Sequence, residues 1–323
     1  MDRDTALAGL KPHIRDYAEP TDVLVETTTR CNLDCSMCPH GGLEREQGSM
    51  SRETWTHVVT QIAREWPKTR VWPAIMGEPL LRGRELFEMI DEAKTVGVAS
   101  VCLNTNLLGL ATDRMDDLLA CGVDRIFVGV DAASAQTYER IRRGGDFAQL
   151  QERLRLLLDA RQRRRRGPRI ALQFVVQEEN EHEEAAFVES WKSAGYDVEL
   201  KIRPRVGWSY GVESAAEVRR TASVADRIPC LWLLRQMAVF WNGDVPRCDA
   251  DYEGNEIFGN VRETSLTEIW RKLGVLRRRH LGGDFSMSPC AGCDDWAAGR
   301  SETIECRAAA SCSGSAERES VAS

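Results

Sequence analysis

The sequence CNLDCSMC at residues 31–38 contains three of the chain's eleven cysteines. Random placement of eleven cysteines in 323 residues rarely produces a CxxxCxxC spacing, so the motif is a strong signal of metal ligation. Three closely spaced thiolates can ligate three irons of a cubane cluster and leave the fourth iron open for another ligand. A zinc ion with His40 as its fourth ligand is the alternative.

The regions around this motif alternate between short apolar segments and longer amphipathic segments. The apolar segments predict six β-strands, at residues 23–25, 71–75, 101–103, 126–130, 170–176 and 198–202. The amphipathic segments predict helices, as where apolar side chains recur at helical spacing at Trp55, Val58, Val59, Ile62 and Trp66. Six such βα units between residues 21 and 205 predict an α/β fold with a parallel sheet, a partial (β/α)6 TIM-like barrel. In such barrels the chemistry gathers in the loops after the strands, where the cysteine motif lies.

The remaining parts of the chain do not follow this pattern. Residues 1–20 are an N-terminal extension, and residues 206–229 are polar and irregular and are predicted to be a linker. Residues 230–300 are predicted to form a small cysteine-rich domain. Residues 301–323 are rich in Ser, Ala and Glu and are predicted to be a disordered tail.

The cysteine-rich region contains a second group of thiols, at Cys230, Cys248, Cys290 and Cys293. Four thiolates can hold either zinc or an iron–sulfur cluster. The other cysteines need no ligand role. Cys102 and Cys121 are expected in the core, and Cys306 and Cys312 fall in the predicted tail.

The composition limits the partners of the protein. The chain has 43 basic and 50 acidic residues and a net charge of −7, so no overall positive field attracts nucleic acid. No run approaches the roughly 18 apolar residues of a membrane-spanning helix, and the first residues do not resemble a signal peptide. We therefore expect a cytoplasmic protein without a nucleic-acid or membrane partner.

Further motifs follow the second, third and fourth predicted strands, at Met76-Gly77-Glu78-Pro79, Asn104-Thr105-Asn106 and Val128-Gly129-Val130-Asp131. With the CxxxCxxC motif, they make the chain resemble the radical S-adenosylmethionine (SAM) superfamily, whose corresponding motifs are GGEP, TNG and SLD. Met76 replaces the first glycine of GGEP, and Gly129 stands where that family usually has serine.

This resemblance implies that Cys31, Cys35 and Cys38 bind a 4Fe–4S cluster whose open iron binds SAM. In that family, reduction of SAM yields a 5′-deoxyadenosyl radical, which abstracts a hydrogen atom from the substrate. The residues implied as SAM contacts are Met37, Gly77, Glu78, Pro79, Asn104, Thr105, Asn106 and Asp131.

The second cysteine group resembles the SPASM and twitch domains that follow radical SAM barrels. Gly299 and Thr303 stand where the full SPASM pattern has further cysteines. The resemblance therefore favours the twitch form, with one auxiliary 4Fe–4S cluster, over zinc. The implied ligands are Cys230, Cys248, Cys290 and Cys293. A fully ligated cluster has no open iron and would accept or deliver one electron.

The spacing in this group is similar to that of aminocyclitol radical SAM dehydrogenases of the butirosin 2-deoxy-scyllo-inosamine dehydrogenase type. The resemblance implies an oxidoreductase that converts an alcohol of an aminocyclitol or aminoglycoside antibiotic intermediate to a ketone. The auxiliary cluster would accept the electron, and a flavodoxin or ferredoxin would be the electron donor. Three alternatives stay open: an aminoglycoside epimerase with a cysteine hydrogen donor, a SPASM-type peptide-modifying enzyme, and a metal-binding module without turnover.

The sequence assigns no catalytic acid, base or hydrogen donor. Five residues near the predicted barrel mouth or the second cysteine group are possible substrate contacts, although each is also explained as a surface group. They are Trp208, Tyr210, Glu213, Asp249 and Asp251.

Overall fold

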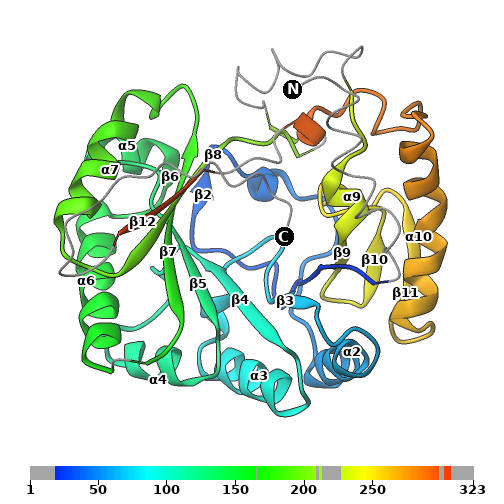
Figure 1. Cartoon of the computed structure of the whole chain (residues 1–323), viewed down its shortest axis with the longest axis horizontal. Coiled ribbons are helices and arrows are strands. Elements are labelled where there is room, and N and C mark those ends of the chain that lie inside the picture. The colour runs from blue at the N-terminus through cyan, green and yellow to red at the C-terminus, as the bar shows by residue number, and fades with distance from the viewer. Residues whose placement is uncertain (1–18, 165, 209–210, 213–226, 298–301, 307–323) are drawn as a thin grey trace.

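One eight-stranded sheet forms the centre of the computed structural model, which describes residues 19–164, 166–208, 211–212, 227–297 and 302–306. Its strands, in order across the sheet, are β12 (Glu302–Cys306), β8 (Val198–Pro204), β7 (Arg169–Val176), β5 (Arg125–Gly129), β4 (Ser100–Thr105), β3 (Arg70–Trp72), β1 (Asp22–Val25) and β9 (Gln236–Val239). Figure 1 shows these strands curving like part of a barrel wall.

Six of these strands confirm the predicted parallel sheet of βα units. Strands β1, β3, β4, β5, β7 and β8 are parallel neighbours in chain order. Strand β3 is shorter than predicted because Pro73 follows it and has no N–H group to continue the ladder. Within the described residues the two outermost strands do not pair with each other, so the sheet is open.

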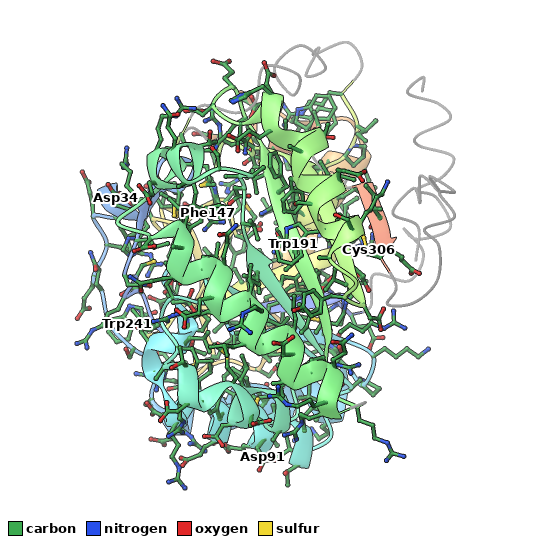
Figure 2. All side chains as sticks on the ribbon, turned by 90° about the vertical axis from the view of Figure 1, so that its left-hand side faces the viewer. Asp34, Asp91, Phe147, Trp191, Trp241 and Cys306 are labelled. Carbon is green, nitrogen blue, oxygen red and sulfur yellow. The ribbon has the colours of Figure 1, made fainter. Side chains whose placement is uncertain are left out.

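Helices cover the outer face of the sheet (Figure 1): α2 (Arg52–Glu65), α3 (Arg84–Thr95), α4 (Met115–Ala120), α5 (Ala135–Ile141), α6 (Phe147–Arg164) and α7 (Glu184–Ser193). Figure 2 views this face, with Phe147 at the start of α6. In α2, Ser51 caps the N-terminus by accepting a hydrogen bond from the Thr54 N–H, and the predicted apolar face is buried.

Two helices and a short strand lie between β5 and β7, where a single βα unit predicts one helix. Helices α5 and α6 are separated by the two-residue strand β6 (Arg142–Arg143) and by Gly144, whose φ of 85° favours glycine. Strand β6 pairs antiparallel with β2 (Asp34–Cys35), inside the first cysteine motif. This pairing is decided by contact between distant segments, so helical periodicity did not indicate it.

The cysteine-rich region is joined to the large sheet. After α9 (Leu231–Arg235), strand β9 pairs in parallel with β1 and extends that sheet. Strands β10 (Asp244–Pro246) and β11 (Ile257–Asn260) form an antiparallel hairpin. Helix α10 (Leu266–Leu281) packs on α2, where the ring centroids of Trp66 and Trp270 are 6.5 Å apart. The predicted boundary at residue 230 therefore does not coincide with a break in the sheet.

The prediction of a disordered tail was wrong for residues 302–306. They form β12, which pairs antiparallel with β8 and so covers backbone N–H and C=O groups along that strand. Cys306 in this strand is buried, with 2% exposure. The predicted core positions of Cys102 and Cys121 are confirmed, since their exposures are 1% and 7%.

Parts of the other predicted regions lie outside the described residues. These parts are residues 1–18 of the N-terminal extension, residues 209–210 and 213–226 of the linker, and residues 301 and 307–323 of the tail, with Cys312. Among the helices that the structure describes, none is both long and apolar enough to cross a membrane.

Candidate active site

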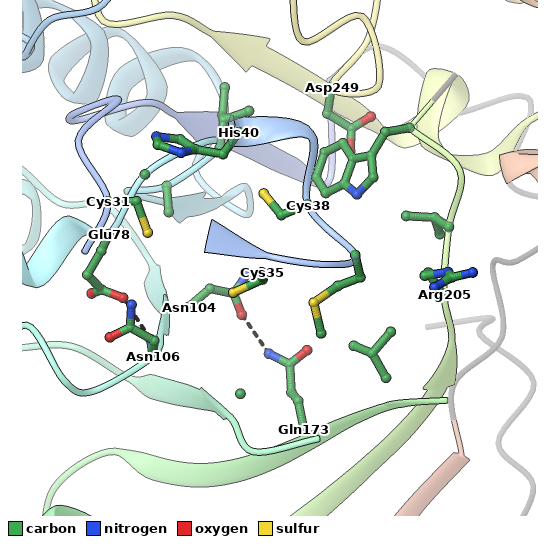
Figure 3. A pocket seen from close by; sticks show the side chains of 18 of the residues that line it. Cys31, Cys35, Cys38, His40, Glu78, Asn104, Asn106, Gln173, Arg205 and Asp249 are labelled. Atoms are coloured by element: carbon green, nitrogen blue, oxygen red, sulfur yellow. Dashed lines mark hydrogen bonds between the residues drawn. The ribbon is translucent and has the colours of Figure 1, made fainter. Parts of the chain in front are cut away.

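The first cysteine motif lies in the loop after β1, at the carboxyl ends of the parallel strands. The β2–β6 pair anchors this loop, with Cys35 opposite Arg142 in the ladder. Figure 3 shows Cys31, Cys35 and Cys38 around one pocket. All three line this cavity, which has a volume of about 290 Å³. The motif therefore occupies the end of the sheet where parallel α/β folds place their chemistry.

The three thiols are close enough to influence one another's ionisation. Burial raises the pKa of the Cys31 thiol, and a charge on Cys35 acts in the same direction. Burial raises the pKa of the Cys38 thiol to about 12, with smaller contributions from Cys35 and Cys31. Bound iron would offset this repulsion, so three thiols on one cavity fit an iron–sulfur cluster with one open iron. Among the described side chains, no three His, Cys, Asp or Glu surround a position for a single metal ion.

Glu78, at the start of the loop's short 3₁₀ turn, joins two of the predicted motifs. This residue is buried, with 2% exposure. One carboxylate oxygen accepts hydrogen bonds from Thr105 Oγ1 at 2.7 Å and the Leu80 N–H at 3.0 Å, and the other accepts from the Asn106 N–H at 2.7 Å. Burial raises the pKa of Glu78, whereas these hydrogen bonds lower it. The carboxylate therefore holds the loop after β3 against the loop after β4.

Gly77 allows the same loop to approach the cysteine motif. Its φ is 84°, and a Cβ at this position would overlap the carbonyl oxygen of Thr28. The next N–H, of Glu78, donates to the Arg30 carbonyl oxygen at 2.7 Å. Only glycine fits such a close backbone approach without strain.

The floor of the cavity is polar. Gln173 Nε2 donates to Asn104 Oδ1 at 2.8 Å (Figure 3). Arg203 and Arg205 also line the cavity, and the Nε atom of each is buried without a hydrogen-bond partner among the described residues. Sequence reasoning missed Gln173 and Arg203, although a polar residue within or at the end of an apolar strand is a signal for a site at this edge.

Six of the eight residues expected to contact SAM line the cavity: Met37, Gly77, Glu78, Asn104, Thr105 and Asn106. Pro79 and Asp131 are not among the described residues that line it. Asp131 is fully buried, and its carboxylate accepts hydrogen bonds from the Val175 N–H at 2.6 Å and from Arg142 Nε at 2.7 Å. Asp131 therefore holds Arg142, which lines the cavity, and its contact with SAM stays a prediction.

The second cysteine group lines a smaller cavity of about 30 Å³. One member caps the N-terminus of α9, one lies two residues after β10, and two lie in a turn after α10: Cys230, Cys248, Cys290 and Cys293. Burial raises the pKa of the Cys230 thiol, and charges on Cys293, Asp249 and Cys290 act in the same direction. Four thiols with this mutual influence fit a cluster whose irons are all ligated by the protein.

The two cavities share a wall. Trp232, Asp249, Ala250 and Asp295 line both of them. Trp232 Nε1 donates to the Asp295 carbonyl oxygen at 3.2 Å, which connects α9 to the last cysteine turn. Burial, and then the charge of Asp295, raises the pKa of Asp249 to about 6. The wall between the cysteine groups therefore carries two neighbouring carboxyl groups.

The five possible substrate contacts have different positions. Trp208 and Asp249 line the first cavity. Asp251 does not belong to that lining: its exposure is 3%, and its carboxylate accepts hydrogen bonds from the N–H groups of Asn255 and Glu256 at 2.9 and 3.1 Å. Tyr210 and Glu213 lie outside the described residues.

Two family models match the regions that carry the two cysteine groups. The model of the radical SAM superfamily matches residues 25–189, about half of the chain. The chain belongs to the radical SAM superfamily. The SPASM model, an iron–sulfur cluster-binding domain, matches residues 230–294. The predicted family, fold class and cofactors are thereby confirmed: SAM, a 4Fe–4S cluster, and further iron–sulfur binding in the SPASM domain.

Curated relatives of this radical SAM protein act on different substrates. The PqqA peptide cyclase of Gluconobacter oxydans is 27% identical over 320 residues, which cover 88% of this chain and 87% of that protein. A probable GTP 3′,8-cyclase of Saccharolobus solfataricus is 29% identical over 174 residues, which cover 54% of each chain.

Solved structures share the fold at low sequence identity. The structure of BtrN in complex with AdoMet and 2-DOIA has a TM-score of 0.58 and 17% identity, covering 85% of this chain and 93% of that one. Streptococcus suis SuiB bound to the precursor peptide SuiA has a TM-score of 0.66 and 13% identity, covering 91% and 74%. At these low identities, the likeness to both structures shows a shared fold alone.

Replacing Glu78 by glutamine is expected to weaken SAM binding about 10- to 100-fold, with little change in iron content. The amide has one acceptor oxygen in place of two, so it cannot accept from both Thr105 and the Asn106 N–H as the carboxylate does. Hydrogen bonds to a charged group contribute about 1.5–3 kcal/mol each, which corresponds to this range of affinity. Equilibrium binding of SAM and iron analysis of the reconstituted protein measure the two effects. Unchanged affinity would show that Glu78 does not shape the SAM site.

Proposed function

We propose that this protein is a radical SAM oxidoreductase that oxidises an alcohol of an aminocyclitol or aminoglycoside intermediate to a ketone. The observation that carries this proposal is the wall shared by the two cavities, at Trp232, Asp249, Ala250 and Asp295. A substrate held in the first cavity would therefore contact a wall that also lines the cavity of the second cysteine group. Such an arrangement suits a reaction in which the substrate loses an electron to a second cluster.

We assign the ligands of the cofactors from the two thiol groups. Cys31, Cys35 and Cys38 would hold the SAM-binding cluster, and the second cavity's four cysteines would hold the auxiliary cluster. An alcohol that becomes a ketone loses a hydrogen atom, a proton and an electron, and the bound cofactors supply acceptors for the hydrogen atom and the electron. The remaining proton must pass to the protein or to water.

The chain's own residues in the first cavity can bind and orient a polar substrate. Asn104 and Gln173 form an amide pair on the floor, with Arg203 and Arg205 nearby. On the opposite wall, the Asp249 carboxylate lies beside Asp295, and this pair would bind an ammonium group of an aminocyclitol. In this proposal the Asp249 carboxylate, which lines the first cavity, would accept the hydroxyl proton.

The epimerase alternative would need a cysteine beside the substrate. Of the cysteines outside the two groups, Cys102, Cys121 and Cys306 are buried in the described structure and none of them lines either cavity. This placement favours oxidation over epimerisation.

Peptide modification is the second candidate function. It is favoured by the PqqA peptide cyclase of Gluconobacter oxydans, which this chain matches over 88% of its length, and by the fold shared with SuiB. Amide and guanidinium groups at the cavity floor could bind peptide carbonyl groups as well as sugar hydroxyls.

Incubation of the reduced, reconstituted protein and SAM with aminocyclitols, aminoglycosides and short peptides tests the proposal. Oxidation gives a product two mass units lighter, with a carbonyl that reacts with hydroxylamine and about one 5′-deoxyadenosine per product. A product of unchanged mass in H2O that takes up deuterium in D2O would establish epimerisation in place of oxidation. A modified peptide, with no change in any aminocyclitol, would overturn the assigned substrate class.

A further inference from the structure

The space beside Gly129, at the end of β5, is occupied by a side chain from another part of the chain. A Cβ at Gly129 would overlap Nη2 of Arg142 and lie 2.8 Å from its Cζ. Both residues line the first cavity. Glycine at this position therefore leaves room for the guanidinium group, which reaches the strand end from β6.

Arg142 is held in one orientation by a buried carboxylate. Its Nε donates to Asp131 Oδ2 at 2.7 Å, and the other Asp131 oxygen accepts from the Val175 N–H at 2.6 Å. Asp131 has a φ of 59°, and Asn180 Nδ2 donates to its carbonyl oxygen at 2.8 Å. Such a buried, fully used carboxylate restricts the rotamers of its arginine partner.

The free end of this guanidinium contacts the first cysteine motif. Arg142 Nη1 donates to Cys35 Sγ at 3.6 Å, and the Arg142 backbone pairs with Cys35 in the β2–β6 ladder. Cys35 is 7% exposed and the Arg142 side chain is 16% exposed, so water screens this contact poorly.

We propose that Arg142 is a positioning residue that raises the reduction potential of the cluster held by Cys31, Cys35 and Cys38. A hydrogen-bond donor and a positive charge beside a ligand sulfur stabilise the reduced cluster, which is the more negative state. Asp131 and Gly129 serve this role indirectly, because one orients the guanidinium and the other makes room for it. The inference rests on the assigned cluster ligands and is independent of the substrate.

Redox titration of the reconstituted holoprotein, followed by electron paramagnetic resonance, tests the role of Arg142. The signal to follow is the one that changes when SAM is added. In Arg142→Gln the midpoint potential measured from this signal should be more negative, with unchanged iron content. Arg143→Gln is the matched control, because it removes an adjacent charge whose side chain is 55% exposed and paired with Asp34. An unchanged potential in Arg142→Gln, or an equal shift in Arg143→Gln, would overturn the proposal.

Gly129→Ala gives an independent test that leaves the arginine in the sequence. The new methyl group must displace the guanidinium, so the potential should shift in the same direction as in Arg142→Gln. The double variant should shift no further than Arg142→Gln alone, because both changes remove one interaction. Additive shifts would overturn the proposal. Loss of the cluster in both single variants, with native circular dichroism, would also overturn the proposal. Arg142 would then act in assembling the cysteine loop.

Discussion

Replacing Cys31, Cys35 and Cys38 together by alanine is expected to abolish SAM cleavage and to lower the iron content from about eight to about four per chain. The three thiols line the first cavity, whereas the remaining four candidate ligands line the second. Loss of the first set should therefore leave the second cluster in place. Iron and sulfide analysis after anaerobic reconstitution, with chromatography of 5′-deoxyadenosine, measures both effects.

The control for this triple variant is Cys121→Ala, a buried cysteine that lines neither cavity. It should keep about eight irons and normal SAM cleavage. Stoichiometric zinc in the second cysteine group of an iron-replete preparation would contradict the assignment of two clusters.

Replacing Cys290 or Cys293 by alanine is expected to suppress oxidation of the substrate almost completely while SAM cleavage continues without product. The reason is that these thiols line only the second cavity, so the SAM site keeps its own ligands. The variant would lack the acceptor for the electron that the substrate must lose. Product and 5′-deoxyadenosine are measured in the same reaction, and their ratio should fall from about one towards zero.

Collapse of the cysteine-rich region is the main alternative cause of such a loss, because bound metal and folding are coupled. Strand β9 of this region belongs to the large sheet, so collapse would disturb β1 and the SAM site as well. Retained SAM cleavage with native circular dichroism therefore separates the two causes. Normal product formation without the second cluster would contradict the proposed electron acceptor.

Local motifs in the sequence predicted much of the site. The spacing of Cys31, Cys35 and Cys38 is a property of eight consecutive residues, and all three line one cavity. Glu78 and Asn106 were predicted from motifs after two strands, and the hydrogen bond from the Asn106 N–H to Glu78 joins those motifs. Parallel strands end at the same edge of a sheet, so their following loops meet whatever the details of packing.

Contacts between residues that are distant in the sequence were not predicted. Asp131 belongs to a recognisable motif, but its carboxylate is buried against Arg142, which lies in a strand that periodicity did not indicate. Residues 302–306 have the composition of a tail, yet they pair with β8. An edge strand is stabilised by the backbone of its neighbour, and composition carries little information about that neighbour.

The sequence by itself determined the α/β fold, the two thiol groups and the family, because periodicity and short motifs depend on residues near one another in the chain. Only the tertiary structure decided that the two thiol groups face a common wall. Trp232 and Asp295 in that wall are 63 positions apart and meet through a hydrogen bond. The tertiary structure also decided that Arg142 reaches Cys35, 107 positions away. Such contacts depend on how β9 and β6 pair with other segments, and pairing between distant segments is set by the packing of the whole sheet.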